Sequence, residues 1–308
     1  MSVRRASRLG QGVEDALAIA RYHIVLVAMA ASVVFGFVLT GRRPWLVALF
    51  VGLDWFLVNV VNRVTDIAED LRNAIPGTAA VARKKALIVW GSVVLFAGSL
   101  AASHLLWPTL TPYRLAVQLV GLAYNFRVLP ARRGRTRFKE LYFLKNFMSA
   151  VLFVLTCFAY PLAADGGSLA GKLAPLAVLV LFFVPFELSY EVLYDLRDLE
   201  GDRAEGIPTF PVVHGPVVAR RIVDALLALS AVALAAGFLA RAVGVRELLM
   251  LCAPAAQFVF YRSRRRGLTT RDCILVTHLG TAELLLFVAG TALWERAGLP
   301  ANVFLGGG

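Results

Sequence analysis

The sequence predicts an all-α polytopic membrane protein, a nine-transmembrane-helix bundle with a central cavity that opens at the cytoplasmic side. Two observations lead to this fold class. Hydrophobic residues make up 59% of the 308-residue chain and charged residues only 17%, and the apolar residues are gathered into runs of about membrane-spanning length. In addition, acidic residues are concentrated directly after two of these runs. This composition is not that of a soluble domain.

Nine apolar runs are expected to form one transmembrane domain over residues 19–296. A polar arm or surface helix is expected at 1–18 and a tail at 297–308. The first run is too long and too late to be a typical secretory signal, and no small-residue cleavage site follows it. The fourth and eighth runs are the shortest. The runs cover approximately residues 19–40, 45–64, 85–107, 110–126, 141–161, 173–194, 217–240, 246–261 and 273–294.

The net charge of +12 invites a nucleic-acid interpretation, but the distribution of the charge argues against it. If the chain starts in the cytoplasm, most Lys and Arg residues fall in cytoplasmic segments, above all in the loop from Arg127 to Lys139. This bias fits the positive-inside rule with an odd number of helices, which puts the C-terminus on the opposite side. The basic residues therefore indicate topology and contact with a lipid bilayer, and no nucleic-acid partner is expected.

An acid-rich motif follows the sixth run, where Asp195, Asp198 and Asp202 recur at i, i+3 and i+7. If this stretch stays helical, the three carboxylates share one face and should require a cation. Gly206 and Pro208 then favour the end of the helix. A single acidic cluster is more often a solvated helix end, so this motif alone does not define a site.

A second acidic motif follows the second run, where Asn62, Asp66 and Asp70 recur every four residues. Both motifs lie at the cytoplasmic mouths of predicted helices, so they could contribute to one site. Oxygen ligands from several carboxylates, completed by water or by a substrate phosphate, suit Mg2+. The two motifs together predict a Mg2+ site.

The most basic loop precedes the fifth run. Arg137, Lys139 and Lys145 lie nearest to the membrane there, and Arg and Lys side chains bind phosphate oxygens well. This loop is either an anion clamp or only a determinant of topology.

Several carboxylates lie within or near the predicted helices, where they are costly and usually face a cavity. Asp54 is a candidate for the pocket wall, or else a buried acid that a neighbouring helix satisfies. Glu187, Glu191 and Asp195 form an i, i+4, i+8 ladder that could line one side of the cavity. Glu283 could orient a polar acceptor or hydrogen-bond across helices.

Carboxylate clusters, Mg2+ and cationic side chains at a membrane interface call for a substrate with a polyanionic head and an apolar tail. A prenyl diphosphate fits this description. Metal ions neutralise the leaving diphosphate, and an apolar pocket keeps the allylic cation from water.

At these residues the sequence resembles the UbiA-type intramembrane prenyltransferase superfamily, a family of nine-helix bundles with two Asp-rich motifs. The first motif appears as Asn62-Arg-Val-Thr-Asp66-Ile-Ala-Glu-Asp70 and the second as Asp195-Leu-Arg-Asp198-Leu-Glu-Gly-Asp202. The segment that continues the second motif looks like the version in the geranylgeranylglyceryl-phosphate and chlorophyll branches. The resemblance covers the whole chain in helix count and topology, and it is specific in these two motifs.

The resemblance implies a Mg2+-dependent transferase that moves a prenyl group from its diphosphate to an aromatic or lipid-precursor acceptor. The implied metal ligands are Asn62, Asp66, Asp70, Asp195, Asp198 and Asp202. The implied catalytic residues are Asp66, Asp70, Asp198, Asp202, Tyr124 and Tyr194, with the two tyrosines along the path of the cation. The implied contacts to diphosphate oxygens are Arg63, Arg137, Lys139, Lys145 and Arg203.

The motifs depart from the family pattern in two places. Arg63 replaces an acid that usually follows the Asn of the first motif, which removes one potential ligand and adds a cation. The second motif is spaced three then four residues rather than four and four. Two other functions remain open: a terpene cyclase on the same scaffold, and a transporter that uses intramembrane acids as an ion relay.

Overall fold

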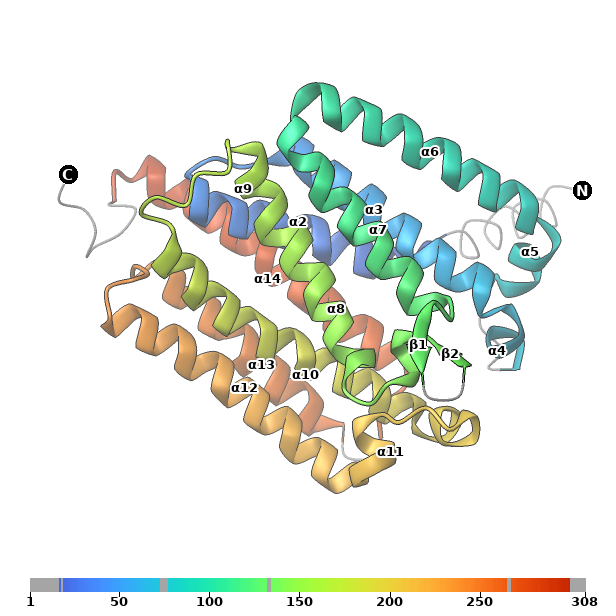
Figure 1. Ribbon diagram of the computed structural model, residues 1–308. Helices are drawn as coiled ribbons and strands as arrows, with labels where there is room; N and C mark the ends of the chain where they lie inside the picture. The colour runs from blue at the N-terminus through green and yellow to red at the C-terminus, as the bar shows by residue number, and fades with distance from the viewer. Residues whose placement is uncertain (1–16, 18, 73–76, 132–133, 265–266, 300–308) are drawn as a thin grey trace, which may run out of the picture.

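The computed structural model describes residues 17, 19–72, 77–131, 134–264 and 267–299. Within these residues the chain is a bundle of helices (Figure 1). Nearly all of the arm expected at 1–18, and most of the tail expected at 297–308, lie outside the described residues.

The first half of the chain consists of long helices joined by shorter helices and turns. The helices are α2 (Tyr22–Thr40), α3 (Trp45–Thr65), α4 (Ile67–Arg72), α5 (Thr78–Arg83), α6 (Lys85–Leu106) and α7 (Thr111–Asn125), with a 3-10 turn at Pro108–Leu110. A two-stranded antiparallel hairpin, β1 (Leu129–Ala131) and β2 (Gly134–Thr136), and a 3-10 turn at Phe138–Glu140 follow α7.

The second half begins with a helical stretch that contains a π-helical turn. α8 (Leu144–Val154) continues through a π-helical turn at Leu155–Ala159 into α9 (Tyr160–Ala164). The remaining helices are α10 (Leu173–Glu205), α11 (Phe210–His214), α12 (Pro216–Leu239), α13 (Cys252–Ser263), which a 3-10 turn at Glu247–Leu251 precedes, and α14 (Thr270–Arg296).

Seven helical stretches in the described part of the chain are long and apolar enough to cross a membrane: α2, α3, α6, the continuous α8–α9 stretch, α10, α12 and α14. The protein is therefore a multi-pass integral membrane protein. The two remaining predicted runs are also helical, but α7 has 15 residues and α13 only 12. These are the runs at 110–126 and 246–261, and the predicted count of nine spanning helices is not confirmed.

The longest helix, α10, carries the second acidic motif. Its 33 residues run past the end of the apolar stretch to Glu205, so the prediction that Asp195, Asp198 and Asp202 lie on one continuous helix is confirmed. Gly206 ends the helix with φ 69°, and the backbone N–H of Ile207 donates to the carbonyl of Asp202 at 2.9 Å. This is the closing geometry that a Gly just after a helix favours.

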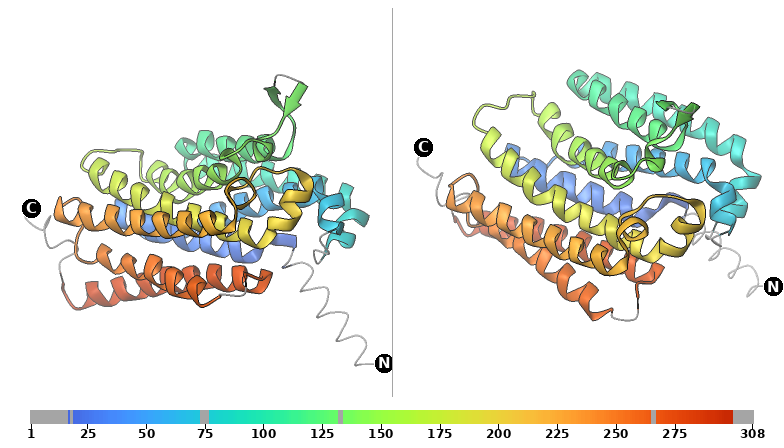
Figure 2. Two further views of the ribbon diagram at one scale, coloured as in Figure 1. Left: turned by 90° about the horizontal axis from the view of Figure 1, so that it is seen from below. Right: turned by 60° about the horizontal axis from the view of Figure 1, so that its bottom comes forward.

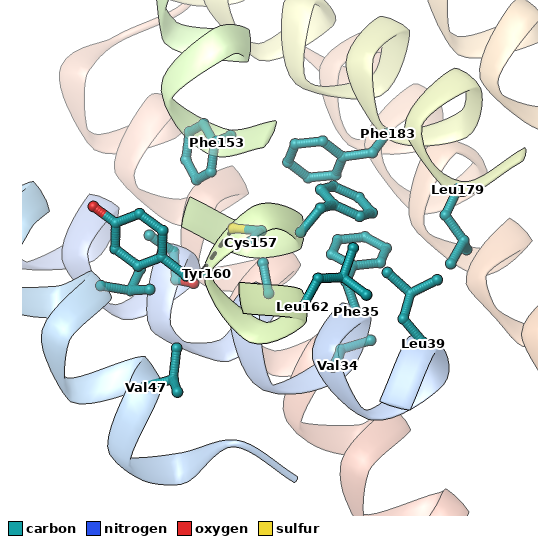
Figure 3. Packing of buried hydrophobic residues seen from close by; sticks show 14 of the residues in the cluster. Val34, Phe35, Leu39, Val47, Phe153, Cys157, Tyr160, Leu162, Leu179 and Phe183 are labelled. Carbon is teal, nitrogen blue, oxygen red and sulfur yellow. Dashed lines mark hydrogen bonds between the residues drawn. The ribbon is translucent and has the colours of Figure 1, made fainter. Parts of the chain in front are cut away.

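The core lies where α2, α8–α9 and α10 meet (Figure 3). Phe35 of α2 stacks on Phe158 with ring centroids 4.5 Å apart, and Phe183 of α10 meets both rings edge to face. Offset and edge-to-face contacts are the arrangements that aromatic rings prefer. In contrast, α6 lies at the edge of the bundle (Figures 1 and 2). Most of its side chains are exposed, and only Ser99 and Ser103 are buried, as expected for a helix that faces lipid.

The first and last long helices run in the same direction. The Tyr22 hydroxyl at the start of α2 lies 2.9 Å from Nε2 of His278, in the first half of α14, while Arg43, just after α2, donates to Glu295 near the end of α14 at 3.0 Å. The start of α2 and the end of α14 therefore lie at opposite ends of the bundle.

Candidate active site

A cavity of about 1040 Å³ runs between the helices. Both acidic motifs line it, on α3–α4 and on α10. The rest of its wall is mainly apolar and aromatic and includes Val34, Phe35, Phe153, Phe182, Phe183, Phe186, Leu284 and Phe287. The cavity thus has one charged end and a long apolar part, and both motifs line it, so that they are placed where they could contribute to one site.

The first motif forms one side of the charged end. Asp66 lies at the point where α3 ends, and its side chain is buried. One carboxylate oxygen, Oδ2, accepts from Nζ of Lys139 at 2.9 Å, and the other accepts from Nη1 of Arg137 at 3.4 Å. Asp70, on α4, accepts from Nη1 of Arg63 at 2.8 Å. Asn62 also lines the cavity, although the helix breaks between it and Asp70.

The second motif forms the other side. Nζ of Lys145 donates to Oδ1 of Asp195 at 2.9 Å and to Oδ2 of Asp202 at 3.0 Å. The other oxygen of Asp195 accepts from the amide of Asn146 at 2.6 Å. Asp198 is more exposed and is paired with the neighbouring Arg197. All three aspartates line the cavity, so the shared helix face is directed towards the first motif.

The loop between α7 and α8, together with the first turn of α8, supplies cations to both walls. Its hairpin is held by Glu140, which accepts from Arg127 at 2.8 Å, from Arg137 at 3.1 Å and from Thr136 at 3.0 Å. Burial alone would raise the pKa of Glu140, but the hydrogen bonds from Arg127 and Thr136 and the nearby guanidinium charges outweigh it and hold the pKa below its ordinary value. Lys139 of this loop therefore contacts the first acidic motif, and Lys145, in the first turn of α8, contacts the second.

The two tyrosines expected along the path of the cation, Tyr124 and Tyr194, both line the cavity. The hydroxyl of Tyr194 donates to the carbonyl of Cys273 at 3.1 Å and lies 2.9 Å from Oγ1 of Thr277. These contacts to α14 fix the ring against the cavity wall. Tyr190, which we did not single out from the sequence, lines the cavity one turn earlier on α10.

Three of the four membrane-embedded glutamate and aspartate residues that we expected near the acceptor line the cavity: Glu187, Glu191 and Glu283. Glu187 accepts a hydrogen bond from the hydroxyl of Ser149 on α8 at 2.6 Å. Glu283 reaches the cavity from α14.

The expectation that Asp54 forms part of the pocket wall is wrong. Asp54 is fully buried and does not line the cavity. Its carboxylate accepts two hydrogen bonds from Arg114 of α7, both at 2.8 Å, and one from the Tyr160 hydroxyl at 2.9 Å. A buried carboxylate needs such partners to offset its lost hydration, and here a neighbouring helix supplies them.

Arg203 is also placed differently from the expectation. Its side chain is exposed and does not line the cavity, because it lies on the outer side of the last turn of α10. Arg137 does not line the cavity either, but it reaches the first motif through Asp66.

The oxygen ligands expected for a metal lie on two walls rather than around one point. No three His, Cys, Asp or Glu side chains in the described residues are close enough together to enclose an ion. All six predicted ligands nevertheless line the same cavity, and each of them offers oxygen, the donor that Mg2+ prefers. The donor set fits Mg2+, with Lys139, Arg137, Arg63 and Lys145 as the present partners of the carboxylates.

Comparison with known proteins gives the family. The model of the UbiA prenyltransferase family matches residues 55–276, which is more than half of the chain. The chain belongs to the UbiA prenyltransferase family. The matched region holds both acidic motifs, the basic loop and most of the helices that line the cavity.

Two similar proteins are named for the same enzyme activity. The digeranylgeranylglyceryl phosphate synthase of Halobacterium salinarum is 36% identical over 62% of this chain and 65% of its own length. The chain thus spans slightly less than two thirds of that relative. The digeranylgeranylglyceryl phosphate synthase of Thermococcus kodakarensis is 30% identical over 84% of this chain and 91% of its own length.

A UbiA homolog from Archaeoglobus fulgidus, solved with DMAPP and Mg2+, has the same fold. Its TM-score is 0.65 at 17% sequence identity, and the match covers 89% of this chain and 98% of that one. At this identity the likeness shows the fold alone.

Proposed function

We propose that this chain is a Mg2+-dependent intramembrane prenyltransferase that moves a prenyl group from its diphosphate to a glyceryl phosphate acceptor. The observation that carries the proposal is the cavity, which joins two acidic motifs and two lysines at one end to an apolar, aromatic wall. A prenyl diphosphate has the same division between a polyanionic head and an apolar tail. The relatives and the fold neighbour described above support the same chemistry.

The ion pairs at the charged end suggest how the head group is bound. In the structure Lys139 holds Asp66, while Lys145 holds Asp195 and Asp202. We propose that Asn62, Asp66 and Asp70 on one wall and Asp195, Asp198 and Asp202 on the other hold Mg2+. When bound, the metal neutralises the diphosphate and makes it a better leaving group. The lysines would then exchange their carboxylate partners for diphosphate oxygens, and Arg63 would add a further cation.

The aromatic wall suits the reacting end of the substrate. Phe153, Phe182, Phe183, Phe186 and Tyr194 line the cavity beyond the acidic motifs. An aromatic face attracts a cation, and a mainly apolar wall limits the access of the water that would capture an allylic cation. We infer that the prenyl chain lies along these rings, with its first carbon near the level of Tyr194.

The acceptor follows from the named relatives. Their product is a glyceryl phosphate that carries two geranylgeranyl groups, so a chain of the same activity would add the second group to geranylgeranylglyceryl phosphate. The cavity contains arginines that could face the acceptor phosphate, among them Arg21 and Arg197. We also propose that the acidic motifs lie on the cytoplasmic side, because the Lys and Arg residues gather there.

The aromatic wall also favours a second candidate, a terpene cyclase in which the cation is quenched within its own chain. The test for both is one assay. The purified protein in lipid is given geranylgeranyl diphosphate and Mg2+, with and without geranylgeranylglyceryl phosphate, and the products are identified by mass. Acceptor-dependent formation of digeranylgeranylglyceryl phosphate supports the transferase, and a cyclic hydrocarbon formed without acceptor supports the cyclase. Failure to release diphosphate under any condition would overturn both.

A further inference from the structure

A pair of carboxyl groups lines the cavity beyond the second acidic motif. Glu191 lies one helical turn from Asp195 on α10, and Glu187 lies one turn further. With a rise of about 1.5 Å per residue, Glu191 is about 6 Å and Glu187 about 12 Å from Asp195 along the helix axis. The pair therefore flanks the part of the cavity that a substrate reaches just beyond its diphosphate.

Glu187 is only 5% exposed, yet only one of its two carboxyl oxygens accepts a hydrogen bond from a described residue. Oε1 accepts from the hydroxyl of Ser149 at 2.6 Å, whereas Oε2 has no hydrogen-bond partner among the described residues. A buried polar atom without a partner is costly. Because Glu187 also lines the cavity, a polar group of a bound ligand is the natural partner.

The carboxyl groups of these two glutamates are not engaged in ion pairs with other described residues. Neither Glu187 nor Glu191 forms a salt bridge with another described residue. Lys145, which reaches the next turn of α10 from α8, is already bound to Asp195 and Asp202. The aspartates of the motifs are held by cations and are assigned here to the metal, so they are poor candidates for taking up a proton. Glu187 and Glu191 are therefore the available bases next to the second motif on α10.

We propose that Glu191, with Glu187 and Ser149 beside it, takes the proton from the acceptor hydroxyl group. This inference rests on the proposed function. The bond from the first prenyl carbon to the diphosphate oxygen breaks, and its electron pair leaves with the diphosphate. The acceptor oxygen donates a lone pair to that carbon to form the ether bond. The hydroxyl proton passes to the Glu191 carboxylate, which later returns it to water.

Glu187 and Ser149 have a positioning role in this scheme. Ser149 donates to Glu187 from α8, so the two residues tie α8 to α10 at the level of the reaction. The second oxygen of Glu187 is free to accept a hydrogen bond from the acceptor hydroxyl. Removal of the carboxylate charge at 187 should therefore weaken the binding of the acceptor more than it slows the transfer of bound substrate.

The test compares ether formation with donor hydrolysis in the wild type and in Glu191→Gln. Hydrolysis of geranylgeranyl diphosphate without acceptor reports only the departure of the diphosphate, because water then captures the cation. Glu191→Gln should lower the kcat of ether formation on the order of 100-fold or more, the usual contribution of a general base. Acceptor-free hydrolysis and the KM for the donor should stay unchanged.

Two further variants sharpen the test. Glu187→Gln should raise the KM for the acceptor with a smaller loss of kcat, and Glu191→Asp, which keeps a carboxyl group, should recover part of the activity that Glu191→Gln loses. Glu295→Gln is the matched control, because this glutamate pairs with Arg43 at the opposite end of the bundle.

Two outcomes would overturn the inference. One is wild-type ether formation in Glu191→Gln. The other is an equal loss of ether formation and acceptor-free hydrolysis, which would mean that the pair acts on the cation or on the fold. A wild-type protein that releases no diphosphate at all would instead contradict the proposed function.

Discussion

Lys139 and Lys145 come from one short segment and bind opposite walls of the cavity. Nζ of Lys139 lies 2.9 Å from Asp66 in the first acidic motif, and Nζ of Lys145 lies 2.9 Å from Asp195 in the second. One segment, the end of the loop and the first turn of α8, therefore contacts two motifs that are far apart in the sequence. Because the lysines and the carboxylates neutralise one another, the charged end of the cavity can stay folded before any substrate binds.

The first prediction concerns the diphosphate. Lys139→Ala should raise the KM for the prenyl diphosphate about 10- to 100-fold, since a hydrogen bond to a charged group contributes roughly 1.5–3 kcal/mol. Steady-state kinetics in lipid measure this change. Lys172→Ala, which removes a lysine paired with Asp165 in the loop before α10, is the control. An unchanged KM in Lys139→Ala would show that the loop only determines topology.

The second prediction concerns the buried pair of Asp54 and Arg114. Breaking it by Arg114→Met leaves a fully buried carboxylate with fewer partners and should cost about 3–5 kcal/mol. Unfolding in detergent measures the loss. The double variant Asp54→Leu/Arg114→Met should recover much of it, because apolar residues can replace a buried pair. A double variant less stable than Arg114→Met would contradict this account.

The third prediction concerns the contact between α10 and α12. A Cβ atom at Gly237 would lie 2.2 Å from Cγ1 of Val178, so Gly237→Ala should destabilise the protein by about 1–3 kcal/mol through overpacking. At Gly91 of α6 a Cβ atom would meet nothing within 4 Å. Gly91→Ala should be neutral or stabilise the helix by about 0.5–1 kcal/mol. Equal thermal stability of the two variants would show that α10 and α12 are not packed as described.

The fourth prediction concerns pH and the hairpin before α8. The pKa of Glu140 is held below its ordinary value, so its contribution to stability is fully present above the unfolded pKa of about 4.5. It is lost as the pH falls through the lower pKa of the folded state. Amide exchange protection over Leu129–Ala131 and Gly134–Thr136 should therefore be constant near neutral pH and decline below pH 4.5. In Glu140→Gln the protection should be low at all pH values; a wild-type profile in this variant would contradict the role of Glu140.

Much of the site could be predicted from the sequence because its chemistry depends on residue types that are rare in membranes. Acidic clusters after apolar runs indicated one shared site, and the i, i+3, i+7 spacing indicated one helix face. The helix-face prediction holds because α10 stays helical to Glu205, and both motifs line one cavity. Lys139 and Lys145 were identified because they lie nearest to the membrane in and after the most basic loop.

Other features could not be predicted because they depend on how distant helices pack. Asp54 looked like a pocket residue, but it forms a buried ion pair with Arg114. Arg114 lies inside a predicted apolar run, and a basic residue at that depth was the signal that it has a buried acidic partner. Asn146 and Ser149 are ordinary polar residues on α8, and only the packing of α8 on α10 brings them to Asp195 and Glu187. Arg203 lies beside the second motif in sequence, yet the helix turns it outwards.

The most direct test of the two-motif site is Mg2+-dependent release of diphosphate by the purified protein in lipid, measured for the wild type and Asp66→Ala with prenyl diphosphates of several lengths. We expect the wild type to release diphosphate only with Mg2+, and we expect Asp66→Ala, which remains folded, to release none. Asp202→Ala should behave in the same way from the opposite wall. Full activity in both variants, or release that does not depend on Mg2+, would contradict a site shared by the two motifs.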